Sequence, residues 1–386
     1  MGYYLNLLES EKKNPAQGTH PNENFAREVL QLFSIGLVRL KPDGTAELDA
    51  QGKTQPTFDE TVIKGFAKAF SGWSYGTLDN KKADSFHHHD DNVEALWQTP
   101  MQAWTVFHDA GTKSLLNARV LPANQSPQQD MKDALDNIFN HPNVGLFIGR
   151  LLIQRLVTSN PRPAYVQRVS SVFADNGAGQ RGDLRAVVRA VLLDIDARGD
   201  DVAARSAFGK QREPVLRPAQ LLRGLNARSE SGRNAIHYLD GADDALGQSP
   251  LLAPSVFNFY SPGYRPAGPL AAAGLVAPEF QITSETTAVG SLNFFASVVF
   301  NGSYGWDSSM LKLDFAPLLA LATGDGAALI DRLDLLCRDL QMGATTRARL
   351  RTLLAALPAV EAWQREQRVK SELMLRLMSP DHVIQR

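Results

Sequence analysis

The chain has 386 residues, which is long enough for two domains or one large helical domain. Hydrophobic residues make up 44% of it and charged residues 21%, ordinary values for a globular chain with a sizeable core. The 40 basic and 41 acidic side chains nearly cancel, so the composition gives no electrostatic reason to expect nucleic acid as a partner. The single cysteine excludes an intramolecular disulfide, and no apolar run is long enough for a transmembrane helix.

The first strongly patterned segment is a predicted helix from its N-cap Asn22 to its stop Gly36. Apolar residues recur along it at helical spacing and form a broad stripe. The same segment carries Glu23, Arg27 and Glu28. Because a buried charge needs a partner, we expect these three side chains to form a near-buried polar centre. The centre is either a structural ion-pair network or the acidic side of a functional site.

The remaining pattern is mostly helical. Residues 37–49 predict a small β-hairpin, because Pro-Asp-Gly separates two short alternating runs. A capping box of Thr57 and Glu60 predicts the start of the next helix. Residues 241–306 are rich in Gly, Pro, Asn and aromatic residues, and they predict a long irregular segment. Further helices are expected in 130–157, 162–173, 183–192, 218–225, 327–341, 345–357 and 361–378.

These elements predict a mainly α fold, a multi-helical globular array with one small hairpin and one long irregular segment. We expect a single domain over residues 1–386. A sub-boundary is expected near 205–215, where a charged stretch ends in proline. It would separate a motif-bearing helical part, 1–209, from the irregular segment and the C-terminal helices in 210–386.

The residues best suited to chemistry are His108, Asp109 and Lys113, which lie close together in the sequence. His108 and Asp109 can ligate a divalent metal or act as an acid/base pair, and Lys113 can neutralise an anion. The alternative is a structural loop in which Asp109 caps a turn and Lys113 is solvated. The run 87–91, His-His-His-Asp-Asp, can also bind metal, although neighbouring residues on a loop rarely converge on one ion.

Several aromatic residues are candidates for a sugar- or polymer-binding cleft. They are Trp73, Trp97, Trp104, Tyr260 and Tyr264. Each of them, taken alone, is also typical of a hydrophobic core. The sequence leaves both interpretations open.

Several motifs together resemble one bacterial family, the domain of unknown function 1800 family (DUF1800). The motifs are Asn22-Glu23-Asn24-Phe25-Ala26-Arg27-Glu28, Leu32-Phe33-Ser34-Ile35-Gly36, Phe66-Ala67-Lys68-Ala69-Phe70-Ser71-Gly72-Trp73, His108-Asp109-Ala110-Gly111-Thr112-Lys113, His141-Pro142, Pro254-Ser255-Val256-Phe257-Asn258-Phe259 and Ser379-Pro380 with Gln385. The resemblance covers essentially the whole chain. It implies no established activity, because the family is named for lacking one.

The resemblance also implies a compartment and a partner. Members of the family are similar to exported proteins encoded beside a phosphatase- or sulfatase-like exported protein, which we therefore expect as a partner. We expect export to the periplasm or cell surface. Members are often longer at the N-terminus, so this chain resembles one that begins part-way in and lacks the family's N-terminal segment. Helices of that segment would cover apolar surface on residues 23–34 or 58–73.

We expect a hydrolase that acts on an envelope or extracellular polymer, with a divalent metal as the cofactor that its residues would suit. The alternative is a non-catalytic binding or assembly protein of the cell envelope, which would use the aromatic residues of 241–306 as a contact surface. The candidate catalytic residues are His108, Asp109, Lys113 and Glu28, and the candidate binding residues are Glu23, Arg27, Trp73 and Tyr260.

Overall fold

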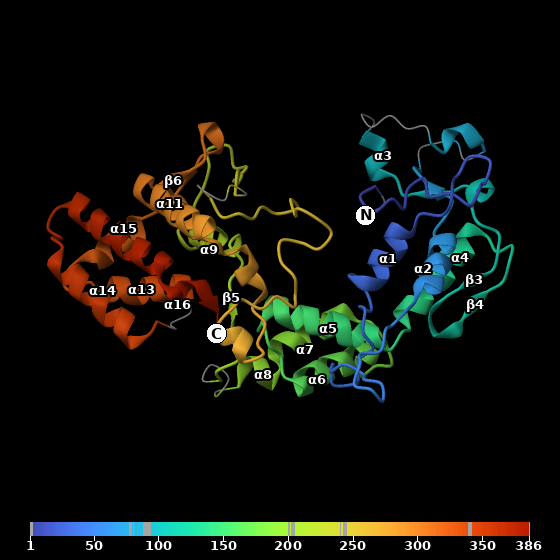
Figure 1. Cartoon of the computed structure of the whole chain (residues 1–386). Helices are drawn as coiled ribbons and strands as arrows, with labels where there is room; N and C mark the ends of the chain where they lie inside the picture. The colour runs from blue at the N-terminus through green and yellow to red at the C-terminus, as the bar shows by residue number, and fades with distance from the viewer. Residues whose placement is uncertain are drawn as a thin grey trace. The chain divides into compact units, whose positions relative to one another are not determined.

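The structure, a computed structural model, describes residues 3–76, 79, 81–87, 94–199, 201, 205–239, 241, 245–338 and 342–385. The prediction of a mainly α fold is confirmed, because the described strands are only two residues long and pair as four small antiparallel sheets (Figure 1). The chain forms two compact units. Unit 1 comprises Met1–Leu156 and Pro161–Gly199, and unit 2 comprises Val157–Asn160 and Asp200–Arg386.

Unit 1 holds the N-terminal helices and two of the sheets. Its helices are α1 (Glu23–Gln31), α2 (Glu60–Ala69), α3 (Glu94–Gln98), α4 (Pro127–Phe139), α5 (Asn143–Leu156), α6 (Pro163–Ala174), α7 (Leu184–Leu193) and α8 (Ile195–Arg198). Strand β1 (Trp73–Ser74) pairs with β2 (Gln102–Ala103), and β3 (Lys113–Ser114) pairs with β4 (Val120–Leu121). Helices α5, α6 and α7 pack together, and α2 packs against α1, α4 and β3.

The packing of α2 depends on small and aromatic residues. Phe25 of α1 meets Phe70, which ends α2, edge to face, with 5.2 Å between the ring centroids. On another side, a Cβ atom on Gly65 would lie 1.8 Å from the backbone oxygen of Ser114 in β3. Only glycine therefore allows this helix to lie so close to that strand.

The start of α1 is as predicted, but that of α2 is not. The Asn22 side chain accepts a hydrogen bond from the backbone of Asn24 at 2.9 Å, so Asn22 is the N-cap. Helix α2 begins at Glu60, and its N-cap is Asp59, whose carboxylate accepts from the Val62 backbone. The predicted capping box with Thr57 is wrong, because the Thr57 hydroxyl instead donates to the carbonyl of Gly36.

The predicted hairpin is present as single β-bridges. Leu40 bridges to Ala46 across the Pro-Asp-Gly turn. Leu48 then bridges to Thr54, and Val38 bridges to Pro56, so a third segment joins the hairpin predicted from residues 37–49.

Unit 2 is built around a second core. Its helices are α9 (Leu216–Gly224), α10 (Pro269–Ala272), α11 (Glu285–Asn301), α12 (Ala316–Leu319), α13 (Ala327–Arg338), α14 (Ala344–Ala356), α15 (Ala362–Met378) and α16 (Pro380–Val383). Strand β5 (Lys210–Gln211) pairs with β8 (Ile384–Gln385), and β6 (Ser303–Tyr304) pairs with β7 (Leu311–Lys312). Helix α11 packs against α15, and both contribute to one buried hydrophobic cluster.

The irregular segment is shorter than predicted. Residues 285–301 of the predicted stretch form α11, a helix of 17 residues that starts at a capping box of Ser284 and Thr287. Its buried residues lie on one face, but Ser291 is on that face and apolar Val289 and Phe300 are on the exposed side, so its sequence lacks the clear amphipathic period of a surface helix. That is why composition alone missed it.

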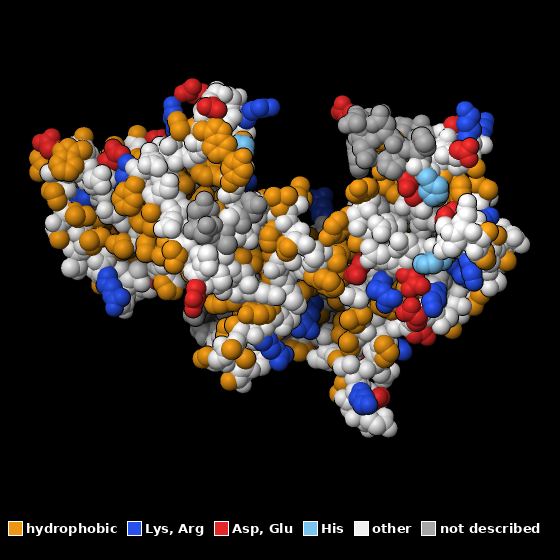
Figure 2. All heavy atoms as spheres, turned by 45° about the horizontal axis from the view of Figure 1, so that its top comes forward, with side chains coloured by type: hydrophobic (Ala, Val, Ile, Leu, Met, Phe, Trp, Pro, Cys, Tyr) orange, Lys and Arg blue, Asp and Glu red, His pale blue; other side chains and the backbone are white. Residues whose placement is uncertain are grey.

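No helix in the part of the chain that the structure describes is long and apolar enough to cross a membrane. On the face shown in Figure 2, acidic and basic side chains are interspersed within both units, as expected from the balanced charge.

Candidate functional site

His108 and Lys113 meet at one carboxylate that sequence reasoning did not select. His108 Nε2 and Lys113 Nζ each lie 2.7 Å from Oδ2 of Asp130, in the first turn of α4. The exposed fraction is 3% for His108 and 0% for Lys113 and Asp130. The cluster is therefore a closed ion network within unit 1, in which one buried carboxylate is shared by a cation and an imidazole.

Backbone groups complete the network on its other side. The second ring nitrogen of His108 lies 2.9 Å from the carbonyl oxygen of Ser71, and the Ser71 hydroxyl accepts from the Asp109 backbone at 2.9 Å. Lys113 Nζ also donates to the Gly111 carbonyl at 2.8 Å. The cluster thus ties together the residue after α2, the 108–113 loop and α4.

The Asp109 carboxylate does not belong to this cluster and has a local role. Its carboxylate accepts a hydrogen bond from the Gly111 backbone at 2.8 Å, which closes a local turn. The structural alternative predicted this turn cap for Asp109. The same alternative placed Lys113 in solvent, which is wrong, because Lys113 is buried.

The residues of this cluster do not suit a divalent metal. The ammonium group of Lys113 lies against one oxygen of Asp130, and its positive charge would repel a metal ion bound to the same carboxylate. Among the described residues, no group of three or more His, Cys, Asp and Glu side chains is placed to hold a metal ion. The His-rich run supplies only His87 to the described structure, because residues 88–91 lie outside the described residues.

The charges of α1 form an ion network near the surface. Arg27 Nη2 lies 3.5 Å from Glu23 and 3.3 Å from Glu60 of α2, and the Arg27 side chain is 40% exposed. The expectation of a near-buried centre is therefore wrong for Arg27, whose long side chain reaches solvent. Glu28 is buried, and burial raises its pKa against the opposing effect of Arg27.

The predicted aromatic binding residues are mostly core residues. Tyr260 and Trp104 are buried, and Trp73 in β1 is half-buried. Trp73 belongs to unit 1 and Tyr260 to unit 2, so the structure assigns them no common site. The Trp97 side chain lies outside the described residues.

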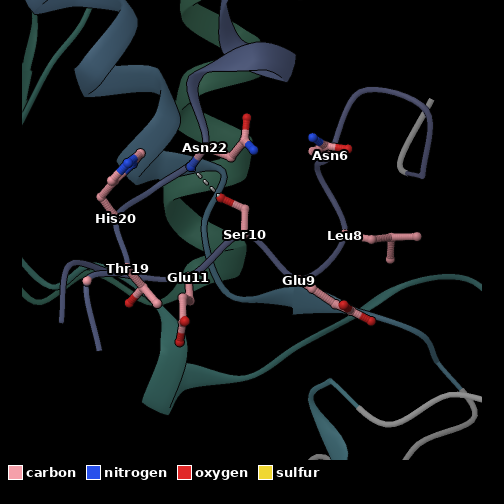
Figure 3. Close-up of a pocket in the computed structure, with 9 residues that line it drawn as sticks. Asn6, Leu8, Glu9, Ser10, Glu11, Thr19, His20 and Asn22 are labelled. Atoms are coloured by element: carbon pink, nitrogen blue, oxygen red, sulfur yellow. Dashed lines mark hydrogen bonds between the residues drawn. The ribbon is translucent and has the colours of Figure 1, made fainter. Parts of the chain in front are cut away.

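An open polar cavity of about 270 Å³ lies in unit 1, beside the start of α1 (Figure 3). Glu9, Glu11 and His20 are among its lining residues, and Ser10 accepts a hydrogen bond there from the backbone of Asn22. Near this cavity, the His87 ring has Nδ1 3.9 Å from a Glu9 oxygen and Nε2 4.0 Å from a Glu11 oxygen. The two carboxylates were not selected from the sequence, because their neighbours carry no motif.

A flat aromatic surface lies exposed on unit 2. Trp306 stacks on Tyr238 with ring centroids 5.4 Å apart and on His237 with centroids 5.1 Å apart, at interplanar angles of 23° and 26°. Tyr238 is 72% exposed and Trp306 50% exposed. We call these three rings the aromatic platform. The contact surface expected on the aromatic residues of 241–306 includes Trp306 but not His237 or Tyr238, which precede that segment and are far from Trp306 in the chain.

The fold and these sites define a two-unit helical protein with buried ion clusters. The family described as "Protein of unknown function (DUF1800)" matches residues 1–384, and the chain belongs to that family. No curated protein and no solved structure matches the chain.

Proposed function

We propose that the protein is a non-catalytic binding protein of the cell envelope, and that its aromatic platform holds the sugar rings of an extracellular polymer. The exposure of Tyr238 and Trp306, combined with their stacking, supports this proposal. Soluble proteins rarely leave neighbouring large apolar rings in water without a binding role.

The shape of the platform favours a sugar ring over other ligands. The stacked rings cover part of each other's faces, and the exposed parts of Tyr238 and Trp306 offer aromatic surface against which the apolar C–H face of a pyranose can pack. Hydroxyl and amide side chains of the same loops, Ser231, Asn234 and Ser308, suit the hydroxyl rim of a sugar. Arg233 and Asp307 nearby have opposite charges, so the surroundings do not select for a polyanion.

The platform rests on a preorganised backbone. Trp306 lies in the turn between β6 and β7, where Gly305 and Asp307 both have positive φ. The Ser231 backbone donates to the Ser308 carbonyl at 2.8 Å, which joins the loop of Tyr238 to the turn of Trp306. Rings that are already in place lose little entropy when a ligand binds.

Location and partner are part of the same proposal. We propose export to the periplasm or cell surface, with a co-encoded phosphatase- or sulfatase-like protein as partner, on the resemblance described above. A binder that holds a polymer beside such an enzyme would raise the enzyme's local substrate concentration.

The test is a binding assay with insoluble polysaccharides and peptidoglycan. Trp306→Ala should weaken the affinity about fivefold or more, taking as a guide the about 1–3 kcal/mol that a nucleobase gains by stacking on one aromatic ring. Trp363→Ala is the matched control, because Trp363 of α15 is 63% exposed in the same unit and lies outside the platform. Equal binding by both variants, or no binding by the wild type, would reject the proposal.

The hydrolase is a second candidate, supported by the two carboxylates near His87. Carboxylates and an imidazole beside an open cavity are groups that can transfer protons. A screen of polymer substrates should then show turnover that Glu11→Gln removes, while the binding measured above stays unchanged. Turnover that Glu11→Gln leaves intact would exclude this site as the catalytic centre.

A further inference from the structure

Unit 2 contains a cavity of about 220 Å³ that is lined by both polar and apolar residues. Arg217, Gln211 and Ser291 are among its polar lining residues, and Leu246 and Ile282 are part of its apolar wall. Exposed residues such as Ala288 and Met378 also line it, so the cavity opens to solvent. Neither proposed function uses this cavity.

Arg217 is a buried cation without a counterion. It is 7% exposed, and its Nη2 donates to the Leu377 carbonyl at 2.9 Å. Its guanidinium lies 4.8 Å from the Phe295 ring centroid, and its Nε has no hydrogen-bond partner. Among the described residues, no carboxylate pairs with Arg217. A buried charge in this state is costly, so the site favours an anion.

Two further positive groups lie near the Arg217 side chain, namely the N-terminal end of α9 and the Arg212 side chain. Arg217 lies in the first turn of α9, where the helix dipole is positive. Burial and the nearby charge of Arg212 lower the pKa of Arg217 to about 10, so the side chain is still a cation at neutral pH. An anion beside Arg217 would offset the repulsion from the helix dipole and from Arg212.

A second polar atom among the lining residues also lacks a partner. The Gln211 side chain donates to the Thr283 hydroxyl at 2.7 Å, but its carbonyl oxygen is buried and receives no hydrogen bond. This oxygen needs a donor, which an ionised ligand does not carry, so a water molecule bound with the ligand would satisfy it while the anion satisfies Arg217.

We propose that this cavity binds a small organic carboxylate, with its carboxylate on Arg217 and its apolar body against Leu246 and Ile282. The fork of a guanidinium matches the two oxygens of a carboxylate. The apolar wall favours a hydrocarbon body over a fully hydrated inorganic anion. A dry cavity of about 150 Å³ holds a benzene ring, so this cavity has room for a chain of about six carbons.

The test is isothermal titration of the full-length protein with hexanoate, hexanol and inorganic phosphate. Wild type should bind hexanoate at one site, and hexanol and phosphate at least about tenfold more weakly. Arg217→Gln should reduce hexanoate affinity to that of hexanol. Equal affinity for hexanoate and hexanol, stronger binding of phosphate, or no binding of hexanoate would overturn the proposal.

A second variant keeps the test decisive if the Arg217 variant fails to fold. Ala288→Trp places a large ring at the exposed edge of the cavity and leaves Arg217 in place. Val289→Trp is its matched control, because Val289 is the next residue of α11, is exposed and does not line the cavity. Hexanoate should bind the Val289 variant and not the Ala288 variant. Retained binding in Ala288→Trp would place the ligand elsewhere.

Trp306→Ala should bind hexanoate normally, which separates this proposal from the aromatic platform.

Discussion

The His108 imidazole meets the Asp130 carboxylate at 2.7 Å, and solvent reaches neither side chain. The contact spans 22 positions of sequence and joins the 108–113 loop to the first turn of α4. Since Lys113 shares the same oxygen, the carboxylate supplies the negative charge to two buried groups whose other partners are backbone carbonyls. Two residues of the predicted catalytic motif, His108 and Lys113, thus link this loop to α4 in the folded protein.

The first prediction concerns the ion cluster of His108, Lys113 and Asp130. Asp130→Asn leaves the Lys113 ammonium buried without its counterion, so we expect a loss of about 3–5 kcal/mol in the free energy of unfolding. Urea unfolding followed by tryptophan fluorescence measures this loss. Asp136→Asn on the same helix is the control, because Asp136 is exposed and pairs with the exposed Lys132 one turn earlier. A similar, small effect of both substitutions would show that the cluster contributes little.

The second prediction concerns Arg27. Exposed ion pairs contribute about 0.2–1 kcal/mol each, and Arg27 bridges the half-exposed Glu23 and Glu60. Arg27→Met removes both pairs and should therefore change the free energy of unfolding by less than about 2 kcal/mol. The sequence alone predicts marked destabilisation here, because it places Arg27 in a near-buried centre. A loss as large as that of Asp130→Asn would restore that interpretation.

Much of the fold is predictable from local patterns. Amphipathic stripes predict α2, α4 and α7, because each buries one face. The same rule fails for α11, because apolar Val289 and Phe300 lie on its exposed side and polar Ser291 on its buried side, so the sequence shows no clear polar face. Caps are less predictable, since Thr57 and Asp59 are both good N-caps and only the tertiary contact of Thr57 decides between them.

The candidate sites are less predictable than the fold. His108 and Lys113 stand out because they share one loop, but Asp130 has an ordinary local role in the first turn of α4. The aromatic platform joins Tyr238 to Trp306 through the β6–β7 turn, a contact that no local pattern encodes. The Arg217 site cannot be predicted from the sequence for the same reason, since the lack of a counterion depends on which residues meet in the folded unit.

The third prediction is a pH dependence that comes from His382. This side chain is fully buried, and burial together with the nearby arginines lowers its pKa to about 3. In the unfolded chain its pKa is about 6.5, so the unfolded state binds more protons at any pH between these values. The stability that His382 contributes is therefore complete above about pH 6.5 and is lost as the pH falls towards 3.

The measurement is urea unfolding at pH 7 and pH 5. Between these values we expect His382 to account for a loss of about 2 kcal/mol, since one proton changes the free energy by about 1.4 kcal/mol per pH unit below the unfolded pKa. His382→Gln removes the titrating group and should reduce the difference between the two pH values by that amount. An unchanged difference would assign the acid sensitivity to other groups.

The last prediction concerns Gly65, where α2 passes β3. A Cβ atom at this position would lie 1.8 Å from the backbone oxygen of Ser114. A backbone atom cannot turn aside as a side chain can, so Gly65→Ala must push α2 away from β3. The cost of such overpacking is about 1–3 kcal/mol or more, and it exceeds the gain of about 0.5–1 kcal/mol that alanine brings to a helix.

Gly224 in α9 is the matched control for this experiment. A Cβ atom there would meet nothing closer than 3.8 Å, which is ordinary van der Waals contact. Gly224→Ala should therefore keep or raise the midpoint of urea unfolding, whereas Gly65→Ala should lower it.

Ser114 adjoins Lys113 in β3, so displacement of the strand by Gly65→Ala should also loosen the Asp130 cluster. In that case Gly65→Ala and Asp130→Asn combined would destabilise by less than the sum of their separate effects. Full additivity of the two losses would show that the strand moves independently of the cluster.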